Sequence, residues 1–211
     1  MGARERRSTS TAAPRVYATF SAVNKNAGLT LSNGNLTVST DSAAHRIVHL
    51  NTGKTSGKWA FEIVLTSALL LNAPQRLVVA GMSGSLPIND VYVGGFSPSV
   101  GWQIVNGDRY TNGSAAGAGT FDSLSAQNAR ALIVMDCDAK KIWCLKNGVL
   151  VPSGAITGTT FYGSVSLYDA VAGVQFATLN AGQSTFGAGN EAAMIAHESS
   201  TASVINRGVW A

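Results

Sequence analysis

Two short apolar runs between residues 129 and 150 constrain the fold more than any other stretch of the chain. The first, residues 131–135, is too short for a stable helix and is rich in strand-forming side chains. The second, residues 142–145, ends at Asn147-Gly148, a pair that favours tight turns. The polar residues between the runs predict a turn, so the stretch predicts a central β-hairpin. A hairpin this apolar needs a second layer to cover it.

Short strand-like segments separated by turns recur along the rest of the chain. Large apolar side chains stand at every odd position from Trp59 to Leu65, which predicts one inward-facing side for that strand. Residues 83–128 are rich in loop-forming residues. Short strands and frequent turns together indicate an all-β fold, a two-layer antiparallel β-sandwich. Further strands are predicted at residues 29–31, 36–38, 45–50, 77–82, 161–167 and 174–179.

The two ends of the chain lack this pattern and are expected to be extended arms. We therefore divide the chain into a basic N-terminal arm at 1–15, a sandwich domain at 16–187 and a C-terminal tail at 188–211 with a short helix at 191–197. Both arms are expected to attach the domain to neighbouring subunits, although a solvated N-terminal tail is an equal alternative. The candidate assembly anchors are Arg4, Arg6, Arg7, Arg15, Val209 and Trp210.

The charge distribution argues against several classes of partner. The arm at 1–15 holds four arginines against one glutamate, a net charge of +3, which leaves +1 of the total +4 for the rest of the chain. A basic groove for specific nucleic acid is therefore not indicated. No apolar run approaches the roughly 20 residues of a membrane span, and no signal peptide is recognised at the N-terminus.

A low content of charged residues is the most unusual feature of the composition. Charged residues make up 12% of the chain, about half of the roughly 25% typical of soluble domains. A surface built of small polar residues suits a subunit buried in an assembly. A glycine-rich β-domain whose composition says nothing about its partners remains an alternative.

The two cysteines flank the turn of the central hairpin. In the predicted register Cys137 faces Lys140 and Cys144 faces Ile133, which is too far out of register for a disulfide. Two buried free thiols are expected, which fits folding in a reducing compartment.

No cluster of residues predicts a metal, cofactor or catalytic site. His45 and His49 would lie roughly 13 Å apart on one face of a strand, too far to share a metal, and both are expected to be partly exposed. The glycine that a phosphate-binding loop requires before Gly53-Lys54-Thr55 is missing. Aspartates such as Asp136 and Asp138 are better explained by turns than by catalysis or calcium. We expect no cofactor, no metal and no enzymatic activity.

Aromatic and polar residues in the loop-rich middle are the remaining candidates for ligand binding. Exposed Tyr, Trp and Arg are typical anchors of protein interfaces, although Trp102 is more readily explained as a core residue. The candidate ligand-binding residues are Arg76, Asn89, Asp90, Tyr92, Arg109 and Tyr110.

Several sequence segments, taken in chain order, resemble the SPRY domain, a concanavalin-like β-sandwich. The resemblance covers roughly residues 16–186, and the hairpin that ends in Lys146-Asn147-Gly148 is its most specific part. The chain departs from the family at Gln127-Asn128, where Gly-Asp is usual, and at Ala181, where an aromatic residue is usual. The matching segments are Ser56-Gly57-Lys58-Trp59-Ala60-Phe61-Glu62, Val79-Ala80-Gly81-Met82, Gly101-Trp102, Tyr110-Thr111-Asn112-Gly113, residues 131–138, residues 141–148, Tyr162-Gly163-Ser164-Val165-Ser166-Leu167 and Asn180-Ala181-Gly182-Gln183.

This resemblance implies a binding protein without catalytic activity, because SPRY domains bind other proteins through loops at one end of the sandwich. The segment 30–37, placed before Ser56-Gly57-Lys58-Trp59, looks like the version found in structural proteins of tailed bacteriophages. The implied function is a virion subunit of a tail fibre, head fibre, spike or decoration protein, made in the host cytoplasm. Its expected partners are other virion proteins, further copies of itself, and a host-surface protein or glycan.

Three alternatives remain open at this point. A lectin-like module would use Tyr92, Trp102 or Tyr110 as a stacking platform for sugars. A polysaccharide-degrading enzyme would need a carboxylate pair that the sequence does not single out. A cellular SPRY adaptor would share the same sandwich, because fold alone does not decide function.

Overall fold

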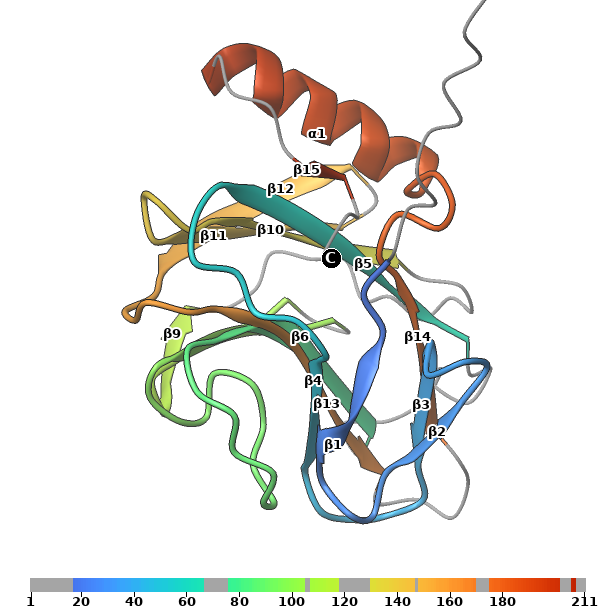
Figure 1. Cartoon of the computed structure of the whole chain (residues 1–211). Coiled ribbons are helices and arrows are strands. Elements are labelled where there is room, and N and C mark those ends of the chain that lie inside the picture. Colours follow the sequence, from blue (N-terminus) through green and yellow to red (C-terminus); the bar gives the residue numbers. More distant parts are fainter. Residues whose placement is uncertain are drawn as a thin grey trace, which may run out of the picture.

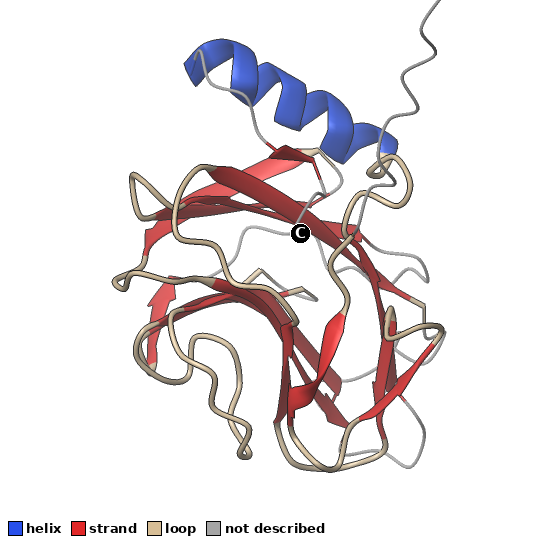
Figure 2. Cartoon of the chain, viewed as in Figure 1, coloured by secondary structure: helices blue, strands red, loops and turns tan. Residues whose placement is uncertain are grey.

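Two antiparallel β-sheets face each other, and one helix lies across the outer face of one sheet (Figures 1 and 2). The computed structural model describes residues 17–66, 76–104, 107–117, 130–146, 148–169, 175–201 and 206–207. The all-β sandwich predicted from the sequence is confirmed.

The first sheet has seven strands among the described residues. Their spatial order is β1-β4-β13-β6-β7-β8-β9, and every neighbouring pair is antiparallel. The strands are β1 (Phe20–Lys25), β4 (Arg46–Leu50), β6 (Arg76–Ser83), β7 (Ser99–Gln103), β8 (Arg109–Thr111), β9 (Ser114–Gly117) and β13 (Tyr162–Asp169).

The second sheet carries the central hairpin. Its described strands follow the order β12-β11-β10-β5-β14-β3-β2, with the short β15 pairing parallel to β5. The strands are β2 (Thr30–Ser32), β3 (Thr37–Thr40), β5 (Lys58–Leu65), β10 (Arg130–Asp136), β11 (Lys141–Lys146), β12 (Val149–Ala155), β14 (Gln175–Asn180) and β15 (Asn206–Arg207).

The central hairpin forms in the predicted register. Ile133 lies opposite Cys144, and both cysteines are free and buried. Burial raises the pKa of the Cys137 thiol to about 11, with Asp138 and Asp136 acting in the same direction, so this thiol stays protonated and unreactive at neutral pH. The absence of a disulfide between these two cysteines is confirmed.

The two aspartates of the hairpin turn stabilise the turn, as expected. One carboxylate oxygen of Asp136 accepts a hydrogen bond from the Ala139 amide at 2.8 Å, and the other lies 3.2 Å from the Lys58 ammonium nitrogen. Asp138 accepts from the Gly57 amide at 3.1 Å, which ties this turn to the start of β5.

The core lies between the sheets and is filled from both. Phe61, Ile63 and Leu65 of β5 point into it, which confirms the predicted inward face of that strand. Val78, Ala80 and Met82 of β6 face them from the first sheet, and Trp102 is completely buried. Trp102 is therefore a core residue and is removed from any exposed binding platform.

The helix α1 (Ala188–Thr201) is longer than the predicted segment 191–197, and it covers the outer face of the second sheet. Its Met194 is fully buried against Ala60, Leu132 and Val134, together with Phe186. This contact explains why the even positions of β5 are buried as well as the odd ones. The part of the tail that forms α1 packs on the domain's own sheet and does not extend away from it.

The predicted assembly anchors at the chain ends lie outside the described residues. These are Arg4, Arg6, Arg7, Arg15, Val209 and Trp210. Within the described ranges, no helix has the length and apolar character needed to cross a membrane.

Candidate functional site

The loop that joins β6 to β7, residues 84–98, folds back over the outer face of the first sheet. Val79 of β6 and Ile47 of β4 point to this face, opposite to the core, and Val93 of the loop buries both. The partly buried Val91, Tyr92 and Phe96 complete this small second cluster. The loop is therefore packed against the sheet and has a defined position.

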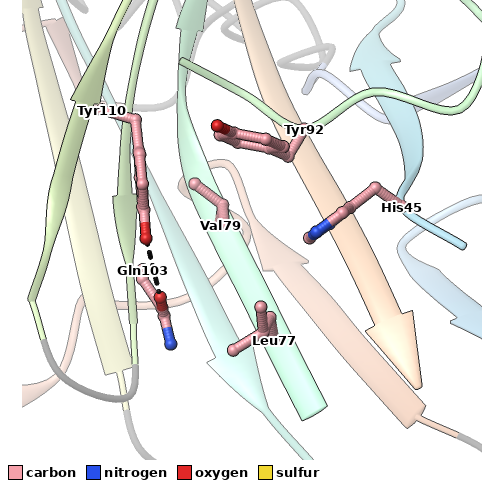
Figure 3. Close-up of a pocket in the computed structure, with 6 residues that line it drawn as sticks. All are labelled: His45, Leu77, Val79, Tyr92, Gln103 and Tyr110. Carbon is pink, nitrogen blue, oxygen red and sulfur yellow. Dashed lines mark hydrogen bonds between the residues drawn. The ribbon is translucent and has the colours of Figure 1, made fainter. Parts of the chain in front are cut away.

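A cavity of about 210 Å³ opens beside this loop (Figure 3). Its floor is formed by two aliphatic side chains of β6, and aromatic rings stand around them. Its lining residues are His45, Leu77, Val79, Tyr92, Gln103 and Tyr110.

Contacts between the rings hold the cavity walls in position. The ring centroids of Tyr92 and Tyr110 are 5.1 Å apart in an edge-to-face arrangement, and those of His45 and Tyr92 are 4.9 Å apart. Tyr168 of β13 packs against the His45 ring, at a centroid distance of 4.8 Å. These spacings fall in the range that stabilises aromatic pairs.

Gly94 allows the loop to approach the β8 wall closely. A Cβ atom at this position would lie 2.6 Å from the Tyr110 Cβ atom, and the residue has a φ of +89°. Glycine is the residue that meets both conditions without strain.

The cavity is uncharged at neutral pH. Burial lowers the pKa of His45 below its usual value. Burial raises the pKa of Tyr110, and Asp108 and Tyr92 add to the shift. The Tyr110 hydroxyl donates a hydrogen bond to the Gln103 side-chain oxygen at 3.3 Å, whereas the buried Nδ1 atom of His45 has no hydrogen-bond partner within the described ranges.

His49 of β4 holds the first half of the loop to the outer face of the first sheet. Its Nε2–H group donates to the Pro87 carbonyl oxygen at 2.8 Å, and its Nδ1 atom lies 2.8 Å from the Ser164 hydroxyl oxygen. The predicted partial exposure of His49 is wrong, because loop 84–98 lies over it and leaves 0% of it exposed. Burial lowers the pKa of His49 to about 4, even though its hydrogen bond to Pro87 acts in the opposite direction.

Asn26 fixes the tip of the same loop. Its amide nitrogen donates to the Ile88 carbonyl oxygen at 3.0 Å and to the Asp90 carboxylate at 2.9 Å. Its side-chain oxygen accepts from the Gly28 amide at 2.9 Å and from the Arg46 guanidinium at 2.8 Å. The Ile88 side chain nevertheless stays 50% exposed. An apolar side chain is thus presented to solvent on a firmly attached loop.

The structure brings together only part of the candidate set from the sequence. Tyr92 and Tyr110 share the cavity, and Asn89 and Asp90 are exposed at the neighbouring loop tip. Arg109 donates to the Ala116 carbonyl oxygen at 2.8 Å within the β8–β9 hairpin and does not line the cavity. Arg76 is the first residue of β6, and its side chain is not among the described parts of the structure.

Sequence reasoning missed His45, Leu77, Val79 and Gln103. The alternation of Leu77 and Val79 with the core residues of β6 was a usable signal, because it leaves two apolar side chains on the outer face of the sheet. No sequence pattern marks His45 or Gln103 as a neighbour of Tyr92. Among the described residues, no group of three or more His, Cys, Asp or Glu side chains could hold a metal ion.

No family model matches the sequence, and no curated protein matches it either. Solved structures do match its fold. The SPRY domain of human HERC1 superposes with a TM-score of 0.61 at 20% identity, covering 76% of this chain and 96% of that domain. A human SPRY domain gives 0.55 at 16% identity (72% and 94% covered), and the PSpry domain of TRIM65 gives 0.57 at 14% identity (78% and 90% covered).

These likenesses show the fold. The chain is a SPRY-type β-sandwich, as the sequence resemblance implied. Each of these three domains is matched over 90–96% of its own length, so the likeness extends over the whole sandwich.

Proposed function

We propose that this protein is a non-catalytic binding module that recognises a protein partner with the tip of loop 84–98. The observation that carries the proposal is the half-exposed Ile88, which stands on backbone held by the buried side chains of Asn26 and His49. An apolar anchor that is already fixed loses little conformational entropy when a partner covers it. The SPRY fold supports this assignment, because SPRY domains generally act as protein-interaction modules.

Polar neighbours of Ile88 suit a small protein interface. Asn89 and Asp90 follow Ile88 directly and are exposed, and Asp90 is oriented by its hydrogen bond from Asn26. An apolar centre with a polar rim is the usual arrangement of a binding surface.

A displayed-peptide library selected against the whole chain tests this function. We expect enriched peptides that bind the wild type and bind Ile88→Asp at least about tenfold more weakly, because a charge would be desolvated at the contact. Val149→Asp is the matched control, since Val149 is 59% exposed on β12 of the other sheet. Equal binding to wild type and Ile88→Asp, or no enrichment at all, would contradict the proposal.

The narrower proposal is a virion subunit of a tailed bacteriophage, in a fibre, spike or decoration protein. It is supported by the resemblance of segment 30–37 to phage structural proteins and by a charged content of only 12%. In such a particle the chain would contact other virion proteins and further copies of itself, and its loop tip would face a host-surface ligand.

A cellular SPRY adaptor is the second candidate function. The observation that favours it is the match to SPRY domains from human proteins. The same loop tip would then bind a cellular protein, and the two candidates differ in where the chain is found.

A further inference from the structure

We propose that the cavity beside loop 84–98 is a second binding site, which takes one neutral, hydroxylated six-membered ring, such as the pyranose ring of an uncharged sugar. This goes beyond the protein contact proposed for Ile88, because the lining residues of the cavity do not include the loop tip. The inference depends on the size, wall chemistry, polar atoms and charge of the cavity.

The size of the cavity corresponds to a single ring with its substituents. An apolar cavity of about 150 Å³ is known to hold benzene, and this cavity measures about 210 Å³. Its Leu77 and Val79 floor and its aromatic walls offer apolar surface, to which the C–H face of a sugar ring is complementary.

Polar atoms in the cavity favour a hydroxylated ligand over an apolar side chain. The buried Nδ1 atom of His45 has no hydrogen-bond partner among the described residues, and the His45 side chain lines the cavity (Figure 3). The Gln103 side-chain oxygen accepts from Tyr110, while its amide nitrogen makes no hydrogen bond within the described part of the chain. A purely apolar ligand would leave these groups unpaired. A sugar hydroxyl both donates and accepts, so it satisfies either tautomer of His45.

The electrostatics of the cavity select a neutral ligand. None of its lining residues is an acid, a lysine or an arginine. The shifts in pKa keep His45 and Tyr110 uncharged at neutral pH. A charged sugar would lose its hydration here without gaining an opposite charge.

The walls are already in place for binding. Tyr92 is held between the rings of His45 and Tyr110, and Tyr168 supports His45 from behind. The Val93 amide donates to the Ser166 hydroxyl at 3.2 Å, which fixes the backbone next to Tyr92. A preorganised site binds a small ligand without first having to order its own side chains.

The test is a nuclear magnetic resonance titration of the whole chain with the methyl glycosides of glucose, galactose, mannose and N-acetylglucosamine. We expect saturable shifts of the Val79, Gln103 and Tyr110 amides for at least one glycoside, with a dissociation constant of about 1 mM, as expected for a ligand of this size. Glucuronic acid is expected to bind at least about tenfold more weakly than the best glycoside.

Two variants assign the binding to the cavity. Tyr92→Ala removes a wall and should weaken binding more than about tenfold, and Tyr110→Phe removes one hydroxyl and should weaken it about three- to tenfold. Tyr162→Phe is the matched control, because Tyr162 is a partly buried tyrosine that does not line the cavity, and its binding should be unchanged.

The sugar assignment is overturned if no glycoside gives saturable shifts, if Tyr92→Ala binds as tightly as wild type, or if glucuronic acid binds best. It is also overturned if the free compounds tyrosinamide or tryptophanamide give saturable shifts at the cavity and the glycosides do not. Ile88→Asp should leave the glycoside titration unchanged while it weakens peptide binding. The two proposals can therefore fail separately.

Discussion

His49 and Glu62 are completely buried ionisable residues on the outer faces of the two sheets. His49 on the first sheet holds loop 84–98 through its bond to Pro87. Glu62 on the second sheet accepts from Arg130 and Asn190, at 2.8 and 3.0 Å, and so connects β10 and α1. Each residue is buried because a segment distant in sequence covers it. Such groups are costly to bury unless they are hydrogen-bonded, which both are.

The buried His49 makes stability depend on pH. Its pKa is lowered from 6.5 to about 4 in the folded protein, so the unfolded chain takes up this proton first as the pH falls. Stability is therefore expected to decrease between about pH 6.5 and pH 4, by roughly 3 kcal/mol at most. The lowered pKa of His45 acts in the same direction. Urea unfolding measured across this range checks the prediction.

The variant His49→Gln is the control for that measurement. It should be less stable than wild type at pH 7, because the contacts of the imidazole are lost, but its stability should change less between pH 6.5 and pH 4. If the free energy of unfolding falls equally with pH in wild type and variant, other groups cause the pH dependence.

At the scale of elements, the docking of α1 depends on one asparagine near its N-terminus. Asn190 is 1% exposed and donates to Glu62, while its side-chain oxygen accepts from the Gly148 amide at 3.0 Å. Gly148 has a φ of +83°, and a Cβ atom there would lie 2.8 Å from the Gly189 carbonyl oxygen. The turn between β11 and β12 and the first turn of α1 therefore fit closely against each other.

Replacing Asn190 with alanine should loosen this contact. The change removes one of the two hydrogen bonds to the Glu62 Oε1 atom, which keeps the Gly187 amide, and leaves the Gly148 amide without its side-chain partner. We therefore expect a loss of about 1–3 kcal/mol in the free energy of unfolding. Amide hydrogen exchange should become faster in residues 188–201 while the amides of β5 are still protected. Ile195→Ala, at a position 44% exposed on the same helix, should have a much smaller effect. Unchanged protection of the helix in Asn190→Ala would contradict this explanation.

At the scale of the whole molecule, the proposed place in a virion concerns the N-terminal arm. Residues 1–15 carry a net charge of +3 on a chain of total charge +4. Antibody labelling of purified particles is expected to place the protein on tailed virions. Deleting residues 1–15 should leave the melting temperature unchanged and abolish incorporation. A label confined to the soluble fraction of the cell, or full incorporation of the deletion, would refute the virion assignment and favour the cellular adaptor.

Local patterns in the sequence were sufficient for many strands of the sandwich, but no strand was predicted at β1 or β12, and β7, β8 and β9 lie in the stretch described only as loop-rich. The register of the central hairpin followed from where the apolar runs end, so Ile133 and Cys144 could be paired without coordinates. The inward face of β5 followed from its two-residue period. Both inferences concern residues close together in the chain, and for these the alternation of side chains and the turn chemistry settle the geometry.

The position of the cavity was decided by the tertiary structure. His45, Val79, Tyr92 and Gln103 come from four separate segments, and loop 84–98 brings them together by packing on Ile47 and Val79. In the same way α1 returns to bury Glu62. The amino-acid sequence alone determined a two-layer β-sandwich with buried free thiols, because these depend on local periodicity and spacing. Which outer faces became covered, and where a cavity was left, depended on contacts between distant segments, and no local pattern encodes them.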